Sequence, residues 1–215
     1  MTLRPVSHIA GRFESTRTES ATTARLFEFV RYHGAMVLDP VIGILMVASL
    51  ALLFASAGAH KLRDLKRFEE IFSAYELMPP DNRVRISWLV PILEMAVAVG
   101  LILDISRPFA GALGIALLLG YAAAMAVNLR RGRRDLACGC GGPNDRRPIA
   151  PWMVWRNVLI ALGAMAAFAT WSGRRLTLTD GITVAFGVPT IALIYLCIGQ
   201  LFGNAWRAPQ SWGTR

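Results

Sequence analysis

Long apolar runs separated by short charged segments dominate the pattern of this chain. Five of these runs are each long enough to cross a hydrocarbon core, which takes roughly 20 residues of helix at about 1.5 Å per residue. Between the first and second runs, the segment 65–77 carries Phe68, Ile71, Phe72 and Tyr75 at helical spacing among charged residues. This pattern predicts a helix in the membrane interface with its aromatic side chains among the lipid headgroups. The five predicted spans are 40–59, 86–103, 108–129, 149–173 and 181–203.

This pattern predicts an all-α integral membrane protein, a bundle of four core helices plus a fifth. Pro91 and Pro189 lie inside the second and fifth spans. Neighbouring helices in a bundle can satisfy the carbonyl groups that a proline leaves free, so these prolines predict kinks rather than helix ends. Small residues are dense at 111–114 and 122–126, where they allow helices to approach closely.

Composition supports a membrane protein and excludes an ordinary soluble domain. Apolar residues make up 54% of the chain, charged residues only 17%, and the mean hydropathy is +0.45. Soluble domains carry roughly a quarter charged residues. The net charge of +9 comes from Lys and Arg clustered at the ends of the apolar runs, which indicates anchoring in a lipid bilayer and not a nucleic-acid groove.

Three regions follow from this pattern. Residues 1–37 are rich in Ser, Thr and Arg and lack an apolar stretch long enough for a signal peptide, so we expect a disordered or dispensable tail. Met36, four residues before the first span, is an alternative start. Residues 38–204 form the transmembrane domain, and 205–215 form a C-terminal tail.

The distribution of basic residues gives a prediction of orientation. More Lys and Arg residues lie on the face that holds the connections 60–86 and 129–148 and the C-terminal tail than on the opposite face. Cytoplasmic loops carry the excess of these residues. The count therefore places the connection 129–148 in the cytoplasm and the N-terminus outside.

The distinctive chemistry lies in the Cys loop, Cys138-Gly139-Cys140-Gly141-Gly142, between the third and fourth spans. Gly139 can adopt backbone angles that bring the two cysteines within disulfide distance, and so small a ring would be strained and readily reduced. Arginines on both sides of the loop favour thiolate over thiol. A redox pair is one interpretation; two inert loop cysteines, or half a site for Cu(I) or Zn, are the others.

Two charged residues lie inside the predicted spans. Glu94 and Arg156 enter from the face of the Cys loop to similar depths, about 12 Å and about 10 Å. Ionisable residues at such depths are costly to bury and usually functional. We expect the two to pair, either to lock two helices together or to position the Cys loop or a proton path beneath it.

Two further residues near that face are candidates for supporting roles. His60 ends the first span and can titrate near neutrality beside a thiol. Cys197, in the fifth span, could resolve a mixed disulfide, although a lone cysteine in an apolar helix is usually a packing residue.

Several short motifs together resemble the MauE family, methylamine utilisation membrane proteins that are grouped with DoxX-like redox-associated proteins. The resemblance covers about 39–203, and the Cys loop followed by Arg-Asn is its most specific part. The motifs are His60 to Asp64, Phe68, Tyr75 to Pro79, Pro91 to Glu94, Asn128 to Gly132, Cys138 to Gly142 and Arg156-Asn157.

This resemblance implies a role in methylamine metabolism at the bacterial inner membrane. The implied activity is disulfide formation or thiol redox transfer during maturation of a periplasmic protein such as the methylamine dehydrogenase small subunit, with a thioredoxin-like MauD-type partner. Cys138 and Cys140 would form the redox pair, supported by Arg156, Glu94 and His60. A periplasmic client would be easier to reach from the periplasmic face, opposite to the face that the charge count gives.

Three rival functions stay open at the level of sequence. The protein could be a non-catalytic assembly factor, with the cysteines only bracing the loop. It could be a transporter of a metal or small solute that uses the two sulfurs with His60. It could also be an enzyme that reduces a quinone, which would need a quinone cavity near the loop.

Overall fold

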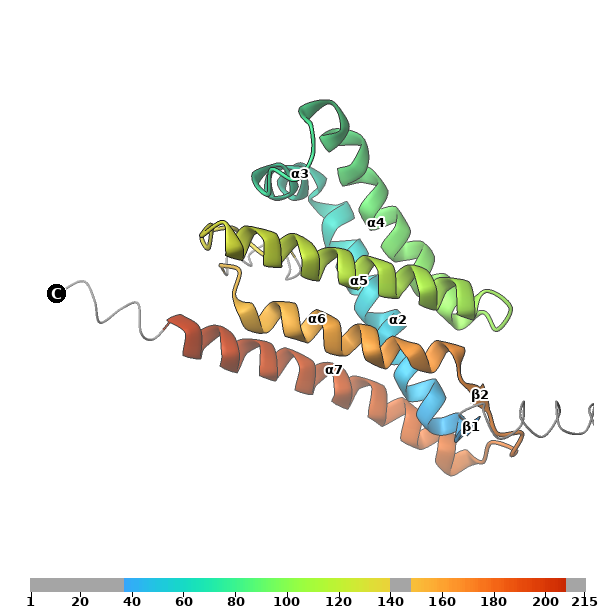
Figure 1. Ribbon diagram of the computed structural model, residues 1–215. Coiled ribbons are helices and arrows are strands. Elements are labelled where there is room, and N and C mark those ends of the chain that lie inside the picture. Colours follow the sequence, from blue (N-terminus) through green and yellow to red (C-terminus); the bar gives the residue numbers. More distant parts are fainter. Residues whose placement is uncertain (1–36, 140–147, 208–215) are drawn as a thin grey trace, which may run out of the picture.

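The computed structural model describes residues 37–139 and 148–207, and it is almost entirely helical (Figure 1). The predicted N-terminal tail, Cys140 to Arg147 and the end of the C-terminal tail lie outside the described residues. The helices are α2 (Pro40–Arg63), α3 (Leu65–Ala74), α4 (Pro80–Ile102), α5 (Arg107–Arg130), α6 (Pro151–Gly163), the 3-10 helix η1 (Ala164–Phe168) and α7 (Leu178–Arg207). Two short strands, β1 (Val37–Leu38) and β2 (Thr170–Trp171), pair in parallel.

Five of these helical segments are long and apolar enough to cross a membrane, which confirms the predicted five-span, all-α membrane protein. They are α2, α4, α5, α6 together with η1, and α7. The observed bounds differ at some ends. α4 begins at Pro80, six residues before the predicted start, because a proline followed by an acidic residue suits the first turn of a helix. The fourth span ends at Phe168, since residues 170–171 pair with β1 instead of continuing a helix.

Small residues bring the core helices together. α2 packs along α4, and α5 packs along both α4 and α6. At the centre, Phe54 and Val97 are almost fully buried against Gly114 of α5, where an added Cβ would lie 3.1 Å from the Phe54 ring. At Gly111 an added Cβ would lie 2.7 Å from the Cβ of Ala167. The predicted role of this small-residue segment in close helix approach is confirmed.

α7 lies at the edge of the bundle, as expected for a fifth helix added to a core of four. Figure 1 shows it alongside α6 at the outer side of the bundle. No residue in its apolar window is buried, and its main packing partner is α2. Gly187 is the point of closest approach, because an added Cβ there would lie 2.6 Å from the Leu45 side chain. Both α4 and α7 continue through their internal prolines.

The bundle has two distinct ends. At one end, β1 and β2 meet and Arg174 binds the carboxylates of both Asp39 and Asp180, at 2.9 Å and 2.7 Å. At the other end, here called the loop end, α3, the C-terminal ends of α2 and α5 and the N-terminal end of α6 lie close together (Figure 1). Cys138 and Gly139, the described residues of the Cys loop, lie at the loop end.

Candidate functional site

The start of the Cys loop is held by backbone hydrogen bonds. Ala137 and Pro148 form an antiparallel bridge, and the Ile149 amide donates to the Leu136 carbonyl at 2.9 Å. The Tyr75 hydroxyl donates to the Ala137 carbonyl at 3.2 Å. We call residues 136–138 and 148–149 the loop base. It fixes the point where the chain enters and leaves the loop.

Cys138 lies at the edge of this base, half-buried on an apolar surface. Its Sγ is 3.8 Å from the Sδ of Met125, and its side chain packs against the cluster of Tyr75, Met125, Ile149 and Met153. The first sulfur of the predicted pair therefore has a defined position at the loop end. Cys140, Gly141 and Gly142 lie outside the described residues.

Both the backbone conformation at position 139 and the side chains packed around it favour glycine there. Its φ of +70° lies in the left-handed region, which side chains other than that of glycine rarely adopt. An added Cβ would lie 3.3 Å from Ile71 and 3.9 Å from the Phe68 ring, both on α3. The positive φ is compatible with the tight turn that the predicted Cys138–Cys140 pair would need, and α3 packs against Gly139.

The amphipathic helix α3 is turned toward the protein more than its sequence suggested. Phe68 and Tyr75, which we expected among the lipid headgroups, are each only 8% exposed. The side-chain amide of buried Asn128 donates to the Tyr75 carbonyl at 3.2 Å, which ties the end of α3 to α5. The interface prediction was wrong for these aromatic residues, because Tyr75 packs on the loop base and α5, and Phe68 packs near Lys61 and Gly139.

Glu94 pairs with Lys61, not with Arg156, so the predicted pair is wrong. The Lys61 ammonium contacts Glu94 Oε1, and the Tyr121 hydroxyl donates to the same oxygen at 2.7 Å. The side chains of Lys61 and Glu94 are 5% and 1% exposed. The Lys61 ammonium also lies 5.3 Å from the centre of the Phe68 ring. The pair is thus connected to the loop through Phe68 and α3.

Arg156 faces a different part of the bundle. Its guanidinium lies 5.3 Å from the Trp152 ring and 5.6 Å from the ring of Tyr195 on α7. The positions of Glu94 and Arg156 in the sequence predict similar depths in the membrane. They do not predict how each helix is rotated about its axis, which decides the direction of the side chain. Glu94 of α4 points toward α2 and α5, whereas Arg156 of α6 points toward α7.

Comparison with known proteins gives the family. The family model for "Methylamine utilisation protein MauE" matches residues 39–172. The chain belongs to the MauE family. It is 36% identical over 155 residues to methylamine utilization protein MauE of Paracoccus denitrificans, covering 72% of this chain and 83% of that protein. It is 34% identical over 130 residues to the MauE protein of Methylorubrum extorquens, covering 60% and 70%. No solved structure matches the chain.

The residues matched by the MauE family model include most of the site. The buried pair Lys61–Glu94, Tyr75, the loop base and Arg156 all lie within 39–172, and α7 lies beyond it. Cys197 is therefore outside the matched part; it is exposed on α7, and among the described residues it forms no disulfide.

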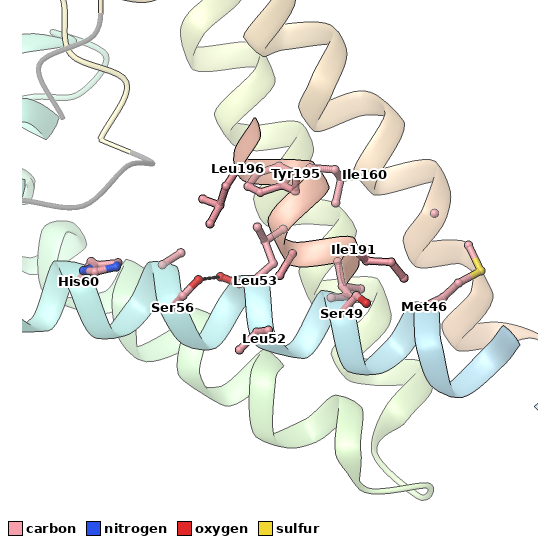
Figure 2. A pocket seen from close by; sticks show the side chains of 14 residues that line it. Met46, Ser49, Leu52, Leu53, Ser56, His60, Ile160, Ile191, Tyr195 and Leu196 are labelled. Atoms are coloured by element: carbon pink, nitrogen blue, oxygen red, sulfur yellow. Dashed lines mark hydrogen bonds between the residues drawn. The ribbon is translucent and has the colours of Figure 1, made fainter. Parts of the chain in front are cut away.

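His60 is next to Lys61 in the chain but lies on another side of α2. It borders a cavity between α2, α6 and α7, and its Nδ1 is buried with no hydrogen-bond partner among the described residues (Figure 2). The structure thus brings Cys138, Lys61 and Glu94 to one side of the loop end, while His60 and Arg156 lie toward α7.

Lys61 is the residue that sequence reasoning missed. The sequence analysis counted it among the basic residues of the connection 60–86, because the first span was predicted to end at residue 59. The helix continues to Arg63, and Lys61 follows Phe54 and Gly58 on the buried stripe of α2. Extending the apolar periodicity by one turn would have placed Lys61 on the core face.

Proposed function

We propose that this MauE-family protein is a multi-pass thiol-disulfide redox protein of the bacterial inner membrane that serves methylamine utilisation. It assists disulfide formation in a periplasmic client such as the methylamine dehydrogenase small subunit. A thioredoxin-like MauD-type protein is the expected partner. The family membership and the five apolar helices support the cellular setting, and the Cys loop supports the chemistry.

One observation carries the proposal: Cys138 is held at the loop end by a built surface. Its backbone neighbour Ala137 is fixed by Tyr75, and its sulfur rests on Met125. Gly139 then turns the chain in a conformation that glycine alone adopts easily. A loop with inert cysteines has no need of this support, whereas an exchanging cysteine benefits from a fixed approach direction.

The chemistry is an exchange of disulfides through a mixed intermediate. A client thiolate attacks the Cys138–Cys140 disulfide, so one S–S bond breaks, a mixed S–S bond forms and one loop thiolate leaves. The second client thiolate then attacks the mixed disulfide. The client gains a disulfide, and the loop is left with two thiols that an electron acceptor must reoxidise. Arginines beside the loop favour the thiolate forms.

The supporting residues act through position. Lys61 and Glu94 hold α2 against α4. The Lys61 ammonium lies close to the Phe68 ring, and that ring packs next to Gly139 of the Cys loop. Arg156 ties α6, the helix that follows the loop, to α7 through Tyr195. We assign these three charged residues to positioning, whereas His60 lines the cavity between α2, α6 and α7.

Thiol trapping in intact cells tests the proposal. A membrane-impermeant maleimide should label the wild-type loop only after mild reduction, and should label Cys138→Ser and Cys140→Ser variants without it. This result requires the loop to face the periplasm, opposite to the charge-count prediction. Free thiols that react only after permeabilisation would refute a periplasmic oxidase.

Client maturation separates the rival functions. The variant with both cysteines replaced by serine should fail to support maturation of a methylamine dehydrogenase-type client. Full maturation in this variant would establish a non-catalytic assembly factor. Stoichiometric bound metal in the wild type that is lost in this variant would establish a metal-binding or transport role.

A further inference from the structure

Apart from the loop site, the bundle contains an apolar cavity of about 650 Å³ between α2, α6 and α7. Its volume lies within the range of about 300–1,000 Å³ that is usual for small-molecule sites. Figure 2 shows it extending along α2, with Met46 near one end and His60 at the other. From Met46 to His60 the helix rises about 21 Å, so the space suits an elongated ligand.

The cavity is reached from the hydrocarbon region. Leu52 and Leu196 border it and are 46% and 59% exposed, and both lie within membrane-spanning helices. A ligand would therefore enter from the bilayer and must itself be soluble in lipid.

Polar groups in the lining are few, and two lack partners. The Ser49 Oγ and the His60 Nδ1 are buried with no hydrogen-bond partner among the described residues. Ser56 is already occupied, since its hydroxyl donates to the Leu53 carbonyl at 2.8 Å. A buried polar group without a partner costs about 1–3 kcal/mol, so a ligand that bonds to His60 recovers part of that cost.

The lining also excludes a charged ligand. Among the described residues that line the cavity there is no Asp, Glu, Lys or Arg. A phosphate or carboxylate placed there would lose its hydration without a lysine or arginine in the lining to bind it. The ligand is thus neutral, with a long apolar part and a hydrogen-bonding end that lies near His60.

We propose that this cavity binds an isoprenoid quinone, with a ring carbonyl accepting a hydrogen bond from His60 and the tail lying along α2 toward Met46. The functional meaning rests on the proposed thiol oxidation, which needs a two-electron acceptor. Two thiols give up two electrons and two protons as they form a disulfide, and the quinone takes up both to become a quinol. His60 lies in the last turn of α2, at the same end of the bundle as Cys138.

Photolabelling tests the site. The full-length protein in phosphatidylcholine nanodiscs is irradiated with an azido derivative of decylubiquinone, and labelled peptides are identified by mass spectrometry. We expect saturable labelling of the α2 segment that ends at His60, displaced by unlabelled decylubiquinone. Labelling that does not saturate, or that added phosphatidylglycerol displaces equally well, would overturn the proposal in favour of a lipid-chain groove.

A second experiment uses cavity-filling variants and a matched control to test whether labelling depends on the open cavity. Ala192→Phe on α7 and Gly163→Leu on α6 fill the cavity from two sides and should each reduce saturable labelling at least about tenfold. Ala185→Phe adds the same ring to an exposed position of α7 outside the lining and should leave labelling unchanged. His60→Phe should weaken decylubiquinone binding roughly tenfold through the lost hydrogen bond. Equal labelling in all four variants would refute the site.

The site and the proposed function can fail separately. Cys138→Ser should keep full labelling, because Cys138 does not line the cavity. Saturable labelling without oxidation of the loop thiols by decylubiquinone would leave the quinone site standing and remove the redox function. Thiol exchange with a thioredoxin-like partner, without saturable labelling, would leave the redox function standing and remove the quinone site.

Discussion

Lys61 and Glu94 form an ion pair that is almost completely buried between α2 and α4, directly beneath the helix that supports the Cys loop. Tyr121 adds a hydrogen bond to the same carboxylate oxygen from α5, so three helices meet at one charged group. The Phe68 ring lies 5.3 Å from the Lys61 ammonium and is also next to Gly139, where an added Cβ would lie 3.9 Å from it. The pair is thus placed to couple the packing of the bundle to the geometry of the loop.

Breaking this pair should be costly, and removing both charges much less so. Lys61→Met leaves the Glu94 carboxylate buried without its cation, and Glu94→Gln leaves the Lys61 ammonium buried without its anion. We expect each single variant to lose about 3–5 kcal/mol in unfolding free energy. The double variant Lys61→Met/Glu94→Gln should recover a large part of that loss, because no buried charge remains. Unfolding in mixed micelles by increasing SDS measures all three. Additive losses in the double variant would contradict a coupled pair.

The hydrogen bond from Tyr121 provides a milder change at the same oxygen. Tyr121→Phe removes a bond to a charged group, which is worth about 1.5–3 kcal/mol, and leaves the ion pair in place. The same SDS titration should show a loss smaller than that of Glu94→Gln. A loss equal to that of Glu94→Gln would mean that Tyr121, not Lys61, is the main partner.

The helices could be predicted from the sequence because hydrophobicity alone specifies them. Each span needs only enough apolar residues, and the positions of Gly111 and Gly114 already indicated a close helix contact. The side-chain partners could not be predicted in the same way. Which side chains pair depends on how each helix is rotated about its axis. Because Arg156 and Glu94 lie at similar depths in the membrane, the sequence predicted their pairing instead of the observed pair of Lys61 and Glu94. The burial of Tyr75 likewise depends on contacts with α5 and the loop base, which are distant in sequence.

Tyr75 should control how firmly the Cys loop is held. Tyr75→Phe keeps the ring in its buried position but removes the hydrogen bond to the Ala137 carbonyl, worth about 1 kcal/mol. We expect the reduced Cys138 thiol to react with maleimide about fivefold faster, as the loop base opens more often. Asn128→Ala, which frees the Tyr75 carbonyl instead, should act in the same direction. An unchanged rate in both variants would show that Tyr75 does not restrain the loop base.

Two glycines with the same backbone conformation separate strain from packing. Gly139 and Gly132 have φ values of +70° and +76°, but an added Cβ would meet Ile71 only at Gly139, and nothing lies within 4 Å at Gly132. Gly132→Ala should cost only the backbone strain, about 1–2 kcal/mol. Gly139→Val should cost more and should also displace Cys138, with loss of redox activity in the client assay. Ile71→Ala added to Gly139→Val should restore part of that activity; equal effects of the two glycine variants would show that α3 does not shape the loop.

At the opposite end of the bundle, stability should depend on pH through Arg174. The hydrogen bond from the Arg174 guanidinium, assisted by the Val41 amide, holds the pKa of Asp39 below its ordinary value of 3.8. A carboxyl group with a lowered pKa in the folded state stabilises the fold above its unfolded pKa, and that contribution is lost as the pH falls through the folded value. The melting temperature in detergent should therefore drop between pH 5 and pH 3 more steeply for the wild type than for Arg174→Gln.

Arg175→Gln changes the neighbouring exposed arginine and should keep the wild-type slope. If Arg174→Gln and the wild type show the same slope, Asp39 and Arg174 do not contribute to holding the start of α2 against the start of α7.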